Sequence, residues 1–114
     1  MTMQLLYDEE GDVLDVIFKD PASNGSQAGY ELRQGVVLYV TAKMSPLQLT
    51  VVNFRRLTQL PVIHFDRLEK QPKKIREKLL SQLASPPLSS LLRIDPVTNY
   101  GHLMSPVLLD VCAA

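Results

Sequence analysis

The segment that most constrains the fold is residues 7–18, an acidic turn that leads directly into an apolar run. The turn, residues 8–12, is rich in carboxylates that accept hydrogen bonds from nearby amides, and Gly11 can adopt a positive φ. The run that follows alternates, so its side chains divide between two faces of a strand. Leu14, Val16 and Phe18 lie on one face, and Val13, Asp15 and Ile17 on the other. We therefore expect a hairpin that pairs residues 3–7 with residues 13–18.

Short apolar runs between turn residues predict three further strands, at residues 30–33, 36–41 and 47–52. Residues 36–41 are apolar on both faces, which is the pattern of a central strand. Residues 19–29 have the composition of a loop. We expect residues 3–53 to form an antiparallel meander of about five strands.

An amphipathic helix is predicted over residues 72–84. Pro72 suits its first turn, and the apolar residues at helical spacing are Ile75, Leu79, Leu80 and Leu83. We expect Leu79 and Leu83 to cover one face of the sheet. Asp66 and Glu69 have the spacing of a capping box, which suggests a preceding single turn at residues 66–70.

The C-terminal part is ambiguous in pattern but apolar in content. Residues 88–95 suggest a short helical turn and then a strand, residues 96–104 a loop, and residues 106–112 a last strand. This content is too apolar for a disordered tail. The expected fold class is thus α+β: a single domain over residues 1–114, made of a meander (3–57), a connector and helix (58–84) and a β-like C-terminal extension (85–114).

The charges balance, at 12 basic and 12 acidic residues, so no overall field favours nucleic acid or membrane. They are nevertheless segregated, because acids dominate residues 1–31 and bases dominate residues 55–78. The lone Cys112 fits a reducing compartment. No run approaches the ~18 apolar residues needed to span a bilayer, and no signal peptide is recognisable. We therefore expect a cytoplasmic protein.

Motifs in the first half of the chain resemble the YuzE-like family of short bacterial domains, whose function is not established. The matching residues are Tyr7-Asp8, Asp12-Val-Leu-Asp-Val-Ile-Phe18, Glu31 and Gly35-Val-Val-Leu-Tyr39. The resemblance covers residues 3–57 and implies a small α+β fold. Some family members are encoded beside toxin-like proteins, which implies an antitoxin-like role.

Two departures from that family pattern concern the end of the meander. Residues 42–46 stand where the family has an Asp-rich turn with Gly. Leu49-Thr50-Val51 stands where its fifth strand has Gly, an apolar residue and Glu. Any function that depends on that Glu would be lost here.

No catalytic, cofactor or metal-ligand pattern is convincing in this sequence. The acidic turn offers Asp8, Glu10 and Asp12 to a cation, but a Ca²⁺ loop also needs Gly at its sixth position, which is Val13. We therefore expect no divalent ion and no cofactor there. His64 lies between two apolar residues, where a hydrogen-bonded histidine is commoner than a catalytic base.

The basic run is the best functional hint. On the predicted helix and the turn before it, the basic side chains lie off the apolar stripe. These candidate partner-binding residues are Arg67, Lys70, Lys73, Lys74, Arg76 and Lys78. No aromatic residue interleaves them for base stacking, which disfavours nucleic acid. Complementarity with the acidic N-terminal part favours self-association or a protein partner, such as a toxin-like protein.

A single helix covers only one face of a five-stranded sheet, so the other face needs a partner. The candidate dimer face consists of Val13, Ile17, Val37 and Tyr39. We expect residues 88–112 to cover this face, from the same chain or from a second copy, and predict a homodimer.

Three hypotheses follow. The first is a non-enzymatic protein-interaction module, with an antitoxin-like regulator as one form. The second is a small-ligand or metal-binding module at the acidic hairpin. The third is a small hydrolase around His64 with Arg55 and Arg56.

Overall fold

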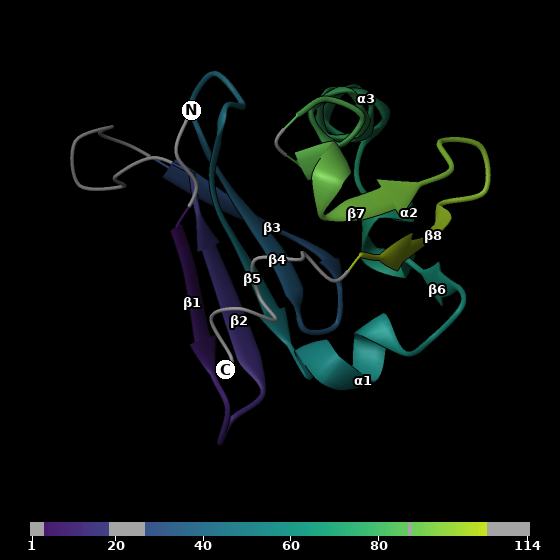
Figure 1. The fold of residues 1–114 in the computed structure, drawn as a ribbon. Helices are drawn as coiled ribbons and strands as arrows, with labels where there is room; N and C mark the ends of the chain where they lie inside the picture. The colour runs from purple at the N-terminus through teal and green to yellow at the C-terminus, as the bar shows by residue number, and fades with distance from the viewer. Residues whose placement is uncertain (1–3, 19–26, 87, 105–114) are drawn as a thin grey trace.

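A five-stranded antiparallel sheet forms one layer of the molecule (Figure 1). The computed structural model describes residues 4–18, 27–86 and 88–104. The strands are β1 (Gln4–Asp8), β2 (Val13–Ile17), β3 (Gln27–Arg33), β4 (Val36–Thr41) and β5 (Pro46–Val52). The predicted five strands and the α+β class are confirmed. The expected loop at 19–29 is wrong for residues 27–29, which belong to β3, and residues 19–26 lie outside the described residues.

The order of the strands is β1-β2-β5-β4-β3, so the sheet is not a continuous meander. β2 pairs with β5, with Leu14 opposite Val51, and β3 lies at the far edge beside β4. Alternation in the sequence specifies which face a side chain occupies, but it does not specify which strand lies alongside. This is why the predicted pairing of β2 with β3 is wrong, whereas β1 with β2, β3 with β4 and β4 with β5 pair in chain order as predicted.

The inner face of the sheet carries the core. The predicted alternation is confirmed, because every inward-facing residue of the central strands is buried and Phe18 is only 5% exposed. These inward residues are Leu14, Val16, Phe18, Val36, Leu38, Val40, Leu47, Leu49 and Val51. Phe65, from the second half of the chain, is a large side chain that is fully buried. Buried residues from both halves of the chain form one hydrophobic cluster.

Three helices lie on the inner side of the sheet: α1 (Phe54–Thr58), α2 (Asp66–Glu69) and α3 (Lys73–Leu83). The predicted helix at 72–84 and the turn at 66–70 are confirmed, and Leu79 and Leu83 join the core. The capping box is wrong: Phe65 is the N-cap of α2 and no side chain caps it. The helix α1 was not expected; it buries Phe54 and Leu57.

A second sheet, in the order β6-β8-β7, completes the inner layer. It contains β6 (Ile63–His64), β7 (Leu92–Ile94) and β8 (Tyr100–Leu103), and a one-turn 3₁₀ helix, η2 (Leu88–Ser90), precedes it. The helical turn and strand expected in residues 88–95 are confirmed. The loop expected at 96–104 is wrong, because its second half is the central strand β8.

The C-terminal segment does not cover the outer face as far as it is described. Leu88, Leu91, Leu92 and Leu103 are buried in the inner core. The prediction that residues 88–112 lie over the other face of the sheet is therefore wrong for residues 88–104. The strand expected at 106–112, and Cys112 with it, lie outside the described residues.

Candidate functional site

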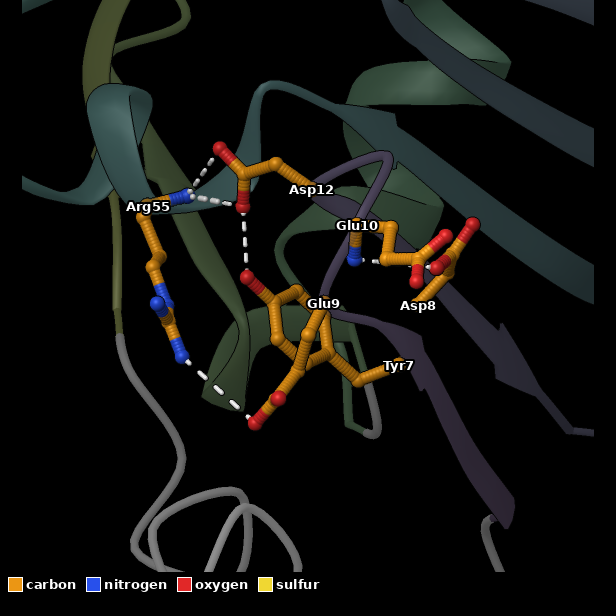
Figure 2. A network of polar contacts seen from close by, with 6 residues as sticks. All are labelled: Tyr7, Asp8, Glu9, Glu10, Asp12 and Arg55. Carbon is orange, nitrogen blue, oxygen red and sulfur yellow. Dashed lines mark hydrogen bonds and ion pairs between the residues drawn. The ribbon is translucent and has the colours of Figure 1, made fainter.

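The acidic turn is attached to the start of α1 through Asp12 (Figure 2). Asp12 has a positive φ of 53°, and its Oδ1 accepts a 2.6 Å hydrogen bond from the Tyr7 hydroxyl. The backbone N–H of Arg55 donates to both oxygens of the same carboxylate, at 3.0 and 3.2 Å. The backbone N–H of Phe54 donates to the Asp12 carbonyl at 3.0 Å. This one residue thus joins the first hairpin to the helix that follows the sheet.

Both side chains of the Tyr7–Asp12 pair have shifted pKa values. Partial desolvation alone would raise the pKa of Asp12, but the hydrogen bonds from Tyr7 and the Arg55 backbone and the charge of Arg55 outweigh it, so the net pKa is below its ordinary 3.8. The pKa of Tyr7 is raised above its ordinary 10.0, first because its hydroxyl donates to Asp12. The pair is therefore most stable as a neutral phenol with an ionised carboxylate.

The other side chains of the turn also have local partners. Asp8 Oδ1 accepts a hydrogen bond from the Glu10 N–H at 3.1 Å, and Arg55 pairs with Glu9 at 3.8 Å. The Arg55 guanidinium also lies 5.4 Å from the centre of the Tyr7 ring. Within the described residues no cluster of three or more His, Cys, Asp or Glu side chains could hold a metal ion. The acidic hairpin is thus a structural junction, and nothing in its geometry favours the metal-binding hypothesis.

His64 lies on β6 and is held between an acid and an aromatic ring. Its Nε2 is 2.6 Å from Glu69 Oε2, and its ring stacks on Tyr100 with 4.3 Å between centroids and 8° between planes. The His64 side chain is 37% exposed. Neither of these two partners, Glu69 and Tyr100, is a serine or cysteine that could act as a nucleophile. The predicted grouping of His64 with Arg55 and Arg56 is not formed through any side-chain contact in this part of the chain.

The basic run lies on α2, α3 and the turn between them. Lys70, Lys73, Lys74 and Lys78 are exposed, as predicted. The two arginines have partners in the same chain: Arg67 Nε is 3.7 Å from Glu31, and an Arg76 guanidinium nitrogen donates to the Glu69 carbonyl at 3.2 Å.

The acid–base contacts expected between two copies form within one chain. The pairs Arg55–Glu9 and Arg67–Glu31 both join the acidic N-terminal part to the basic part. All four side chains are largely exposed, so each pair contributes little to stability. Charge segregation is therefore no longer an argument for a dimer.

The outer face of the five-stranded sheet carries the candidate dimer residues. Val13, Ile17, Val37 and Tyr39 are half-buried there, and the sheet register places them on both sides of β5. The apolar side chains Leu6 and Val52 on the same face are 47% and 39% exposed.

A polar network that the sequence reasoning missed occupies the centre of this outer face. Gln48 Nε2 donates to Asp15 Oδ1 at 3.1 Å, and Thr50 Oγ1 donates to the same oxygen at 2.6 Å. The face that Asp15 shares with Val13 and Ile17 was predicted, but its contact with Gln48 and Thr50 depends on the pairing of β2 with β5. That pairing had no signal in the sequence.

In the part of the chain that the structure describes, no helix is long and apolar enough to cross a membrane. The resemblance to the YuzE-like family stays a prediction that rests on its motif residues. No family model, no curated protein and no solved structure matches this chain.

Proposed function

We propose that this protein is a non-enzymatic protein-interaction module that binds its partner through the outer face of the five-stranded sheet. The observation that carries this proposal is the arrangement of the two faces. The described helices and the small sheet all lie on the inner side of the five-stranded sheet (Figure 1), while apolar side chains such as Leu6 and Val52 remain exposed on the outer side. Apolar side chains gathered on an uncovered face mark an interaction surface.

The donors at the polar centre of the outer face keep their partners when this face is covered. Gln48 and Thr50 already donate to Asp15, so covering this face does not leave their donors without a partner. Burying a polar group costs free energy mainly when its hydrogen bonds are lost. The surrounding valines, isoleucine and tyrosine then supply the apolar area that drives association.

The default partner is a second copy of the chain. In such a dimer the twofold axis would run parallel to β5, between the two sheets. The Val13 and Ile17 side of one copy would then pack on the Val37 and Tyr39 side of the other. Two antiparallel sheets commonly pack face to face in this way, and twofold symmetry is the commonest closed arrangement. The contact would match apolar surface with apolar surface around the two polar centres.

Light scattering behind size exclusion tests this proposal on the full chain. We expect a species of twice the 12.8 kDa chain mass at micromolar concentration. The variants Ile17→Lys and Tyr39→Glu should yield monomers with an unchanged circular-dichroism spectrum, because both side chains lie outside the core. The matched control is Lys74→Glu on the exposed face of α3, which should leave the mass unchanged. A single species near 12.8 kDa for the unaltered chain would contradict the proposal.

A toxin-like protein partner, and with it an antitoxin-like role in the cytoplasm, is the form of this module that the family resemblance implies. The exposed lysines of α3 and the turn before it would suit an acidic partner surface. Affinity co-purification from the native host tests this form. Recovery of the same partner with Lys74→Glu and Lys78→Glu would show that these lysines do not bind it.

A further inference from the structure

A cavity of about 330 Å³ lies where the turn between β3 and β4 meets the junction of β5 and α1. Its volume falls at the lower end of the range for small-molecule sites. Arg33 and Gly35 line the cavity from the β3–β4 turn. Val52 and Asn53 line it from the junction of β5 and α1. Arg56 lies on α1, and Leu60 follows that helix. The β3–β4 turn and the start of α1 lie side by side in Figure 1, although they come from well-separated parts of the sequence.

The lining is cationic. It contains two arginines and no acidic residue. Three acids of the N-terminal part already have other partners, since Glu9 pairs with Arg55, Glu31 pairs with Arg67, and Asp12 accepts a hydrogen bond from the Tyr7 hydroxyl.

The two arginines of the cavity are free to bind an anion. Arg33 uses its Nε to donate to the Gln34 carbonyl at 3.2 Å, which leaves its two terminal nitrogens available. No ion pair of Arg33 or Arg56 occurs within the described residues. A guanidinium is planar and presents paired N–H groups, so it matches a carboxylate in two-pronged geometry.

Two aliphatic side chains form an apolar part of the cavity lining. Val52 is 39% exposed and Leu60 is 41% exposed, so both are large apolar side chains that remain in contact with water. A simple inorganic anion would leave these two apolar side chains exposed to water. A neutral apolar ligand would leave the arginines without a counter-charge.

The walls are held in place before any ligand arrives. The Val52 N–H donates to the Gly35 carbonyl at 2.7 Å and ties the β3–β4 turn to the end of β5. Gly35 has a φ of 88°, which favours glycine, and Asn53 reverses the chain into α1 at a φ of 59°. The Asn53 side chain makes no capping bond to α1. A preformed wall lowers the ordering cost of binding.

We propose that this cavity is a binding site for a small ligand that carries a carboxylate on a short aliphatic chain. The two arginines receive the carboxylate, and Val52 and Leu60 contact the aliphatic part. The site goes beyond the proposed protein-interaction function, because it takes a small ligand at the end of β5 next to α1 and shares only Val52 with the apolar residues named on the outer face.

An NMR titration of the ¹⁵N-labelled full chain tests the site with three probes of matched size or charge. Hexanoate has both features, hexanamide lacks the charge, and inorganic phosphate lacks the aliphatic chain. We expect hexanoate alone to shift the amide signals of Gly35 and Asn53 in a saturable way. Equal responses to hexanoate and phosphate, or to hexanoate and hexanamide, would overturn the proposal.

Two substitutions locate the binding. Arg56→Gln should weaken hexanoate affinity by about tenfold, as expected for loss of one charged contact. Arg67→Gln, which removes an exposed arginine of α2 outside the cavity, is the matched control and should have no effect. Leu60→Ser should also weaken binding, and its amide spectrum reports directly whether the fold is kept. No hexanoate response in the unaltered chain, or equal affinity of Arg56→Gln and Arg67→Gln, would refute the site.

Discussion

Replacing Gly101 by alanine should disrupt the small sheet, because β8 has no room for a side chain at this position. A Cβ built on Gly101 would lie 1.8 Å from the carbonyl oxygen of Arg93 and 2.9 Å from the Cα of Ile94. Both obstacles are backbone atoms of the neighbouring strand β7, so no rotation of a side chain can relieve the contact. The carbonyl would have to move from 1.8 Å to at least 3.0 Å, a shift of about 1.2 Å.

The strand β8 cannot make this shift freely, since it is the middle strand of its sheet. Gly101 is opposite Ile94 on one side and Ile63 on the other. Moving β8 away from β7 would press it against β6, while Leu92 and Leu103 on the two strands are both part of the core. Overpacking usually costs about 1–3 kcal/mol when side chains can yield. With backbone on both sides, we expect Gly101→Ala to lower the free energy of unfolding by about 3 kcal/mol.

Urea unfolding followed by circular dichroism measures this loss, with Gly11→Ala as the matched control. The nearest atom to a Cβ at Gly11 is Asp8 Oδ2 at 2.9 Å, at the far end of an exposed side chain that can move at the cost of at most its one exposed hydrogen bond from the Glu10 N–H. The control should therefore stay within about 0.5 kcal/mol of the unaltered chain. An effect of Gly101→Ala equally small would mean that β8 does not pair with β7 in this register.

Two further perturbations test the core and the Asp12 junction. Phe18→Ala should cost about 3–5 kcal/mol because the ring is buried on the inner face; a loss under ~1 kcal/mol would mean that β2 is shifted by one residue. Tyr7→Phe should lower the free energy of unfolding at pH values between 3.8 and 10.0, the ordinary pKa values of Asp12 and Tyr7. The difference from the unaltered chain should shrink as the pH falls through the lowered pKa of Asp12, and also as it rises through the raised pKa of Tyr7. A difference that stays constant from acid to alkaline pH, measured by urea unfolding, would contradict this assignment.

The candidate sites were only partly visible in the sequence. The exposed lysines and the outward-facing positions of Val13, Ile17, Val37 and Tyr39 follow from helical and strand periodicity. The role of Asp12 was not visible, because its partners Tyr7 and Arg55 are brought to it by the hairpin and by α1. The arginine cavity was not visible either, since its walls come from two separate turns of the chain.

The sequence alone determined the longer local elements of this protein, because regular local spacing is enough to define them, but it did not predict the short elements α1, β6 and β8. Alternation sets the faces of β2, β4 and β5, and helical periodicity sets α3. Only the tertiary structure decided which neighbours depart from chain order. The pairing of β2 with β5 and the strand identity of residues 100–103 depend on contacts between distant segments. Gly101 illustrates the reason: in the sequence it favours a turn, but in the sheet it allows two backbones to approach more closely than any side chain permits.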